Sequence, residues 1–260
     1  NTAGTDGTRL GDELSRIGYA GDMAPGTLRP AAFLELHVEQ GPVLEHAGDV
    51  IGVVENLQGI SWQRVTIAGT ANHAGTTPTA LRADAGLAAA RVQTYLADHL
   101  AGDTTVATVG SLTLSPGVIN VIPARAEFTI DLRDPDNDRL GVAEGKLACY
   151  LGELAETAGL TITTEQLVRF DPVSFDEDLC AHIAAAADRR GLRHRPMTSG
   201  AGHDAQMMAR LCPTAMIFVP SRDGISHNPA EHTDPDHLIA GAEVLLDVLA
   251  ELVGMSVEYD

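Results

Sequence analysis

Residues 61–170 alternate between strand and helix patterns in an order that few folds accommodate. The segment begins and ends with strand-like sequence, SWQRVTIAGT and TITTEQLVRF, and it holds two further strand-like stretches, VATVGSLTL and RAEFTIDLRD. Apolar residues recur at helical spacing in residues 81–100 and 140–158, one stretch on each side of the central strand pair. The order β-α-β-β-α-β predicts a ferredoxin-like unit, in which two helices cover one face of a single sheet.

The sequence on either side of this segment predicts an α/β unit. Residues 33–40 alternate apolar and polar side chains, which is typical of a strand. Residues 213–220, PTAMIFVP, form a continuous apolar run of the kind that is buried on both faces of a parallel sheet. A helical pattern follows Asp234, a suitable N-cap residue, with Pro235 at the first helical position.

These patterns predict two domains in a chain of 260 residues, of which 44% are hydrophobic. That length and composition suffice to bury a core in each domain. We expect an α/β domain made of residues 1–58 and 171–260. We expect residues 59–170 to form an inserted ferredoxin-like domain.

The charge balance excludes partners with a phosphate backbone. The chain carries 36 acidic residues against 17 basic ones and has no cluster of Lys and Arg, which nucleic-acid binding needs. No apolar run approaches the roughly 20 residues that span a bilayer, and no secretory signal is visible. Three scattered cysteines cannot all pair, which is typical of a reducing compartment. We therefore expect a cytoplasmic protein that binds neither nucleic acid nor membrane.

Two of the ten histidines lie where α/β sheets gather ligands. His37 lies near the end of the first predicted strand and shares a strand face with Glu35, and His227 lies in the loop after PTAMIFVP. Because ligands collect at the carboxyl ends of such strands, the two imidazoles could share a metal, with Glu231 as an acceptor for His227. Two histidines make an incomplete zinc site, since a catalytic zinc takes three protein ligands. A solvated polar strand face explains His37 equally well.

Four further polar features could bind a small ligand. His73 follows the first strand of the insert in a Gly-rich loop, Asn120 lies in the turn SPGVINVIP, and Arg133 lies on the strand RAEFTIDLRD. The loop SGAGHDAQ around Gly200 opens a helix and offers free backbone N–H groups to an anion. Taken singly, the first two are turn residues and Arg133 is an exposed ion-pair partner. Arg is nevertheless the side chain best suited to hold a carboxylate through two parallel hydrogen bonds.

Taken together, the motifs of this chain resemble the hydantoinase/carbamoylase branch of the M20 metallopeptidase-like family over essentially its whole length. That branch includes N-carbamoyl-L-amino-acid hydrolases, β-ureidopropionases and allantoate amidohydrolases. The resemblance rests on five segments in the family's order: LELHVEQGPVLE (34–45), GTANHAGTTP (69–78), PGVINVIPARAEFTIDLRDPD (116–136), SGAGHDAQ (199–206) and MIFVPSRDGISHNPAEHT (216–233).

The resemblance implies a role for each matching residue. His37 and His227 match metal-binding histidines. The residues that match substrate contacts are Gln40, His73, Asn120, Arg133 and Gly200, and Arg133 would hold the substrate's carboxylate. The insert of this family also forms a homodimer interface, so that its residues can serve the neighbouring subunit's site.

The resemblance also implies a reaction. Two divalent metal ions, which could be Zn, Mn, Co or Ni, would activate a water, and a glutamate would act as general base. The water would attack the ureido carbonyl of an N-carbamoyl-L-amino acid or a related ureido acid, and the C–N bond would break. The sequence does not choose between carbamoyl-amino acids, ureidopropionate and allantoate, because each carries a ureido group and a carboxylate.

One departure from the family is large. In the family a third histidine, a bridging aspartate, a ligand glutamate and the base glutamate come from a segment before the HxEQGP strand. Residues 1–36 contain no histidine, no HxD motif and no Glu-Glu pair. The chain therefore resembles the C-terminal portion of a family member, without a catalytic base of its own, and we expect weak or partial metal binding and little or no hydrolysis.

Two other interpretations stay open. The chain could be a non-catalytic module in which the insert dimerises and the α/β part is structural. It could also belong to an aminopeptidase of the same superfamily, although the segments HVEQGP and NHAGTTP resemble the ureido-cleaving branch.

Overall fold

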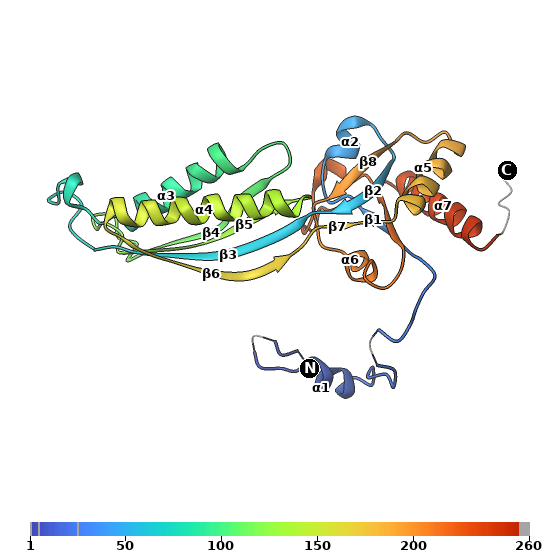
Figure 1. The fold of residues 1–260 in the computed structure, drawn as a ribbon, viewed down its shortest axis with the longest axis horizontal. Coiled ribbons are helices and arrows are strands. Elements are labelled where there is room, and N and C mark those ends of the chain that lie inside the picture. Colours follow the sequence, from blue (N-terminus) through green and yellow to red (C-terminus); the bar gives the residue numbers. More distant parts are fainter. Residues whose placement is uncertain (1, 5, 25, 255–260) are drawn as a thin grey trace.

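The computed structural model describes residues 2–4, 6–24 and 26–254. It is elongated, with two β-sheets placed end to end along its long axis and an amino-terminal arm that extends away from both (Figure 1). Each sheet has its own hydrophobic core, formed by a separate cluster of buried side chains. The fold is therefore of the mixed α/β class that the sequence predicts.

The first sheet has five strands and forms the five-stranded unit. Its strands are β1 (Phe33–Val38), β2 (Ile51–Leu57), β7 (Val173–Ser174), β8 (His194–Ser199) and β9 (Thr214–Val219). β9 lies between β1, with which it is parallel, and β2, with which it is antiparallel, and β7 and β8 also pair with β2. Every residue of β9 is buried, as its uninterrupted apolar sequence predicts, but the sheet is mixed rather than all parallel.

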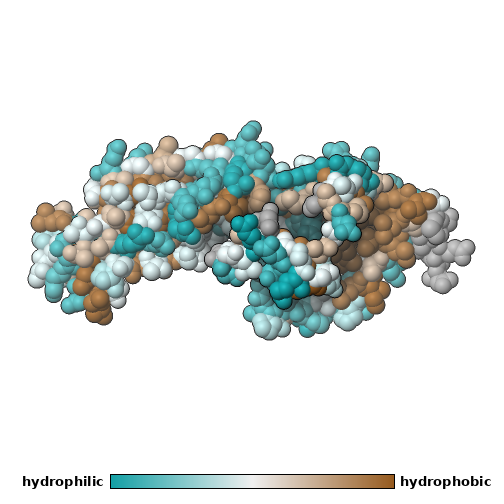
Figure 2. All heavy atoms as spheres, turned by 90° about the horizontal axis from the view of Figure 1, so that it is seen from below, coloured by the Kyte–Doolittle hydropathy of each residue, from teal (hydrophilic) through white to brown (hydrophobic). Residues whose placement is uncertain are grey.

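Four helices accompany this sheet: α2 (Val43–Ala47), α5 (Glu177–Arg189), α6 (Asp204–Met208) and α7 (Pro235–Leu252). α5 and α7 pack against each other, and Arg190 donates to the buried carboxylate of Asp247 at 2.6 Å. Gly241 brings α7 close to the sheet, since a Cβ there would lie 2.6 Å from Val219 Cγ1. The outer face of α7 exposes several leucines, and Figure 2 shows apolar surface gathered over this end of the molecule.

The second sheet has four strands and, with its helices, forms the four-stranded unit. The strands are β3 (Gly59–Ala68), β4 (Val106–Ser115), β5 (Arg125–Asp134) and β6 (Thr161–Phe170). They are antiparallel in the order β4-β5-β3-β6, which is the ferredoxin-like order. Helix α3 (Ala85–Tyr95), which continues as the π-helical turn η2 (Leu96–Leu100), and helix α4 (Asn137–Ala158) cover one face and leave the other open (Figure 1).

The chain passes between the two units twice, at residues 57–59 and 170–173. Gln58 anchors the first crossing, because its backbone N–H donates to the Ser199 carbonyl at 3.1 Å and its Nε2 donates to the Gly200 carbonyl at 3.2 Å. Gly59 packs so closely that an added Cβ would lie 2.8 Å from the ring of Pro172 in the second crossing. The two crossings therefore support each other and fix where the four-stranded unit begins.

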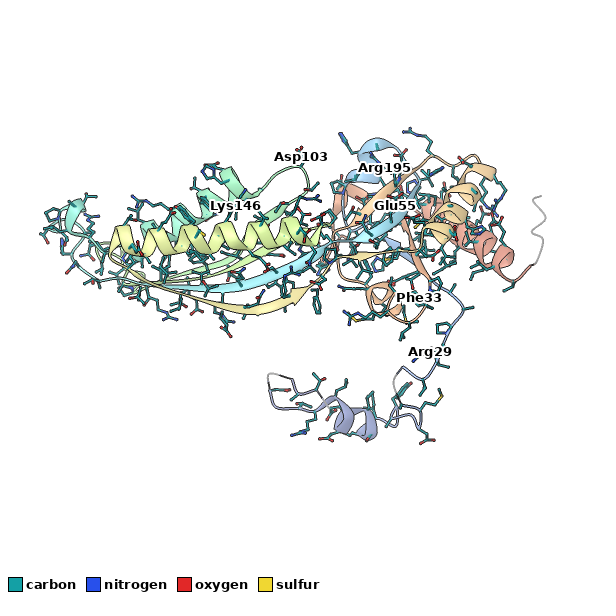
Figure 3. All side chains as sticks on the ribbon, in the orientation of Figure 1. Arg29, Phe33, Glu55, Asp103, Lys146 and Arg195 are labelled. Atoms are coloured by element: carbon teal, nitrogen blue, oxygen red, sulfur yellow. The ribbon has the colours of Figure 1, made fainter. Side chains whose placement is uncertain are left out.

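The amino-terminal arm precedes Phe33, the first residue of β1, and Arg29 lies along it (Figure 3). It contains helix α1 (Leu10–Arg16), of which no residue is buried. Large apolar side chains of the arm are exposed, with Tyr19 at 79% and Leu28 at 71%. None of the described helices combines the length and the apolar character that crossing a bilayer requires.

Candidate metal and substrate site

A cavity of about 450 Å³ lies between the two units, at the carboxyl ends of β1 and β9. His37, His203 and His227 line it from the five-stranded unit, and Arg133 lines it from the four-stranded unit. The parallel pairing of β1 with β9 explains this convergence, since it brings the loops after both strands to one edge of the sheet. His37 and His227, which are 190 positions apart in the sequence, therefore line one cavity. That they share a metal stays a prediction, since the candidate metal group found among the described residues does not include His227.

Two of the histidines that line this cavity, His37 and His203, belong to a candidate metal-binding group. Ligand atoms of Glu35, His37 and His203 all lie within 4.8 Å of one another. Glu35 and His37 come from the same face of β1, and His203 is the N-cap residue of α6. Two imidazoles and a carboxylate are a donor set that zinc and other transition metals accept.

A hydrogen bond leaves Nε2 of His37 as the available ligand atom of that ring. His37 Nδ1 lies 2.8 Å from the carbonyl oxygen of Val38, which only accepts, so the Nδ1 proton is donated there and Nε2 carries the lone pair. Nδ1 of His203 faces Glu35 at 3.6 Å, while its buried Nε2 has no hydrogen-bond partner. A buried nitrogen without a partner is costly, and a metal ion would satisfy it.

The surroundings keep His203 in the neutral form that binds metals. Its side chain is only 3% exposed. Burial, together with the neighbouring ring of His37, lowers the pKa of His203 to about 4, although Asp204 acts in the opposite direction. Glu35 is itself held in place, because its Oε2 accepts a hydrogen bond from the Ala205 backbone N–H at 2.7 Å. The start of α6 thus fixes both the carboxylate and the second imidazole.

Backbone strain marks the loops that border the cavity. The non-glycine residues with positive φ in the described ranges are Gln40 (59°), Asp223 (55°) and His227 (57°), all in the loops after β1 and β9. Each such residue costs on the order of 1–3 kcal/mol, and this strain is concentrated at functional sites in proteins. Two serines fix Gln40, whose N–H donates to Ser221 Oγ and whose Nε2 donates to Ser226 Oγ, both at 3.0 Å.

The predicted partner of His227 takes a different position. Glu231 accepts a hydrogen bond from the backbone N–H of His227 at 3.0 Å, so the carboxylate fixes the loop and does not orient the imidazole ring. The expectation that Glu231 accepts from the ring is therefore wrong in this structure. The reason is local, because the left-handed conformation of His227 turns its N–H toward the carboxylate four residues later.

Arg133 bridges the two units at this cavity. Its Nε and Nη2 bind the carboxylate of Asp131, with Nη2 at 2.6 Å from Oδ2, and its Nη1 donates to the carbonyl of Gly200. These bonds leave one N–H on Nη1 and one on Nη2 for a ligand. Gly200 lines a second cavity of about 690 Å³, which continues from the first past Gln40 and Arg133 and which Asp103 also lines (Figure 3). The structure thus gives Gly200 an accepting carbonyl at the site.

Two predicted site residues lie elsewhere. His73 and Asn120 belong to the loops at the far end of the four-stranded unit, where residues 73 and 121 form a β-bridge and the Ala74 N–H donates to the Asn120 carbonyl at 2.9 Å. Neither residue lines the cavity beside His37. Ile119 next to them is fully exposed.

Reasoning from the sequence did not assign a role to His203. The residue lies within the segment SGAGHDAQ, which stands out in the sequence for its backbone N–H groups and as one of five family segments, without a role for the imidazole. A histidine directly before a short helix, in a loop after a strand, was the available signal. Glu35 was noted on the strand face of His37, and the structure brings it to the group of three.

Comparison with known proteins agrees with this geometry. Residues 11–251 match Peptidase family M20/M25/M40. The N-carbamoyl-L-amino-acid amidohydrolase of Rhizobium meliloti is 39% identical over 95% of this chain and 60% of its own length. The allantoate amidohydrolase of Escherichia coli K12 is 38% identical over 97% of this chain and 62% of its own length.

A solved structure shows the same fold. The amidase of the hydantoinase/carbamoylase family from Burkholderia multivorans superimposes with a TM-score of 0.91 and 42% identity over 97% of this chain and 62% of its own. The chain thus spans about three fifths of the length of these relatives. It belongs to Peptidase family M20/M25/M40, in the hydantoinase/carbamoylase branch.

Proposed function

We propose that this chain carries part of the metal site and the substrate contacts of an amidohydrolase that cleaves the ureido C–N bond of N-carbamoyl-L-amino acids or related ureido acids. The observation that carries the proposal is the cavity lined by His37, His203, His227 and Arg133. Two of these residues, His37 and His203, have ligand atoms within 4.8 Å of each other and of Glu35. The relatives that act on carbamoyl-amino acids and on allantoate support it. The substrate gives an amine, ammonia and carbon dioxide with the uptake of one water.

Different residues of the chain would bind the metal and the two ends of the substrate. His37, His203 and His227, with Glu35, would hold divalent metal, which supplies Lewis acidity and a water that can attack at neutral pH. Arg133 would bind the substrate's carboxylate through the N–H groups that Asp131 and Gly200 leave available. Gln40, fixed by two serines, would contact the ureido group. Holding the substrate at both ends orients its carbonyl toward the metal side of the cavity.

We further propose that the protein acts as a dimer through a domain formed by residues 59–170, with residues 1–58 and 171–260 forming the other domain. His73 and Asn120 lie too far along the four-stranded unit to line this cavity, so they would serve the partner subunit's site. The fully exposed Ile119 beside them is suited to such a contact. The base glutamate and the second half of a dinuclear site are not found in residues 1–36, so this chain by itself would bind metal weakly and hydrolyse little.

The test measures bound metal and ammonia release. The chain is incubated with Zn²⁺, Mn²⁺, Co²⁺ or Ni²⁺ and assayed with N-carbamoyl-L-amino acids and allantoate, alone and when extended by any residues that its gene encodes before Asn1. We expect activity in an extended protein and lower metal content in His37→Ala and His227→Ala. A longer protein with neither metal nor activity would instead favour a structural assembly module.

A further inference from the structure

One wall of the metal cavity is apolar. Ile60, Trp62, Val168 and Phe170 line it, and all four come from strands β3 and β6 of the four-stranded unit. Trp62 and Phe170 are 41% and 39% exposed. Their surface is therefore available to a ligand that enters the cavity.

The strand register explains why this wall stands beside Arg133. Two rows of paired residues cross the open face of the sheet here: Arg133–Ile60–Phe170 and Asp131–Trp62–Val168. Paired residues on neighbouring strands share a face and lie about 5 Å apart. The ion pair of β5 and the apolar side chains of β3 and β6 thus form adjacent stripes on one surface.

We propose that this apolar wall is the side-chain subsite of the ureido acid and that it selects N-carbamoyl amino acids with a large aliphatic or aromatic side chain. This inference rests on the proposed function. A carboxylate held by Arg133 leaves the side chain on the same α-carbon on the sheet face that carries Ile60, which pairs with Arg133, and Trp62, which is the diagonal neighbour of Arg133. Contact with the exposed faces of Trp62 and Phe170 then removes apolar surface of both molecules from water.

The same wall disfavours the other ureido acids. Allantoate carries a second ureido group in place of a side chain, and the four wall residues offer its N–H groups no side-chain acceptor, since the indole N–H of Trp62 only donates. A polar group buried without partners is penalised strongly. N-carbamoylglycine and ureidopropionate have no side chain to cover the wall, so they gain nothing from it.

The fluorescence of Trp62 can report ligand binding directly, because Trp62 is the single tryptophan of the chain. N-carbamoyl-L-phenylalanine, N-carbamoylglycine and allantoate are titrated while Trp62 fluorescence is followed, with calorimetry as the second readout. We expect the phenylalanine compound to shift the emission and to bind at least about tenfold more tightly than the other two. Equal affinities, or no measurable binding of any of the three, would overturn the inference.

Variants of the wall residues show whether the wall itself causes the preference for large side chains. Trp62→Ala should reduce the tenfold preference to less than about threefold, and Trp62→Phe should restore most of it. Leu112→Ala, which removes an exposed leucine from strand β4 outside the cavity, should keep the full preference. A preference that survives Trp62→Ala together with Phe170→Ala would contradict the subsite.

Ammonia release distinguishes a wrong proposed function from a wrong side-chain subsite. If the proposed function is wrong, an extended protein releases no ammonia from any ureido acid, whatever the side-chain preference in binding. If only the subsite is wrong, ammonia is released at rates that do not depend on the side chain.

Discussion

The rings of His37 and His203 meet edge to face, with centroids 4.5 Å apart and planes inclined by 66°. One ring stands on a strand and the other at the start of a short helix that comes 166 positions later. Glu35 joins the two elements, since it shares the strand with His37 and accepts from the Ala205 N–H of the helix. The packing of α6 on β1 thus creates the pair of imidazoles.

Removal of the second imidazole should weaken metal binding. In His203→Ala the unpartnered Nε2 disappears, leaving His37 and Glu35 as the remaining ligands of the group. We expect Zn²⁺ affinity by calorimetry to fall by more than the roughly 10–100-fold that loss of an outer-shell contact causes. His46→Ala, which removes an exposed histidine of α2, should leave it unchanged. Equal Zn²⁺ affinity in both variants would remove His203 from the ligand set.

Loss of Arg133 should weaken substrate binding and leave metal binding unchanged. Arg133→Ala removes the guanidinium from the cavity, so we expect affinity for carboxylate substrates to fall by about 10–100-fold, as for loss of a charged hydrogen bond. Arg133→Lys should recover little, because an ammonium does not form the paired bonds. Calorimetry with an N-carbamoyl amino acid gives the affinity, and bound Zn²⁺ should stay constant. A loss of metal in Arg133→Ala would contradict its assigned role.

Asp134 should make stability dependent on pH in the acid range. Burial acts to raise its pKa, but hydrogen bonds from Thr105, the Asp136 N–H and Arg139 outweigh burial and hold the pKa below the ordinary value of 3.8. The ionised group therefore stabilises the fold above about pH 4, and this contribution is lost as pH falls through the lowered pKa.

The test compares Asp134→Asn with the unaltered chain in urea. At pH 7 we expect the free energy of unfolding to fall by about 1–3 kcal/mol, because buried donors lose a charged acceptor. The difference between the two proteins should shrink below pH 4. Glu156→Gln, on the exposed face of α4, serves as the control and should change little. A difference that is constant between pH 7 and pH 3 would show that ionisation of Asp134 is not involved.

Two helical glycines should respond in opposite directions to alanine. At Gly241 of α7 a Cβ would lie 2.6 Å from Val219 Cγ1 and 2.8 Å from Leu36 Cδ1, so Gly241→Ala should destabilise by about 1–3 kcal/mol. At Gly145 of α4 a Cβ meets nothing within 4 Å, so Gly145→Ala should stabilise by about 0.5–1 kcal/mol. Thermal unfolding measures both, and the same sign for both would refute the packing of α7.

The four-stranded unit could be predicted from the sequence because its pattern is contiguous. Each strand and helix of residues 59–170 shows its own periodicity, and the alternation alone fixes the order of elements. Strand β6 spans Thr161–Phe170 as predicted, whereas the first helix begins only at Ala85 and ends in a π-helical turn. These end positions depend on capping by Asp84 and on tertiary packing, which the periodicity does not contain.

Elements without periodicity were not predicted. Strand β8 has the sequence HRPMTS, in which Pro196 and charged residues obscure the strand pattern. The proline is tolerated because β8 pairs on one side only, with β2. Strand β1, which its alternation does predict, ends at Val38, two residues before the predicted end, and the Glu39 carboxylate that follows accepts from the Val43 N–H at the start of α2. Both outcomes depend on neighbours rather than on the segment itself.

The candidate site was predicted in part. The paired position of His37 and His227 followed from the rule that strand ends gather ligands, and Arg133 followed from family motifs that the cavity supports. His203 required knowledge of how α6 packs on β1, because the sequence does not show that its segment meets the strand of His37. Residue types and strand ends thus predict candidates, and only tertiary packing shows which of them meet.

The parallel pairing of β1 with β9 also limits when this part of the fold can form during synthesis. Phe33 pairs with Thr214, so β1 leaves the ribosome about 180 residues before the strand that completes its side of the sheet. The four-stranded unit is continuous in the chain and can fold during that interval, whereas contacts of such high contact order form late. The nascent polypeptide therefore brings His37 and His203 together only after β9 has been synthesised, when the four-stranded unit is already complete.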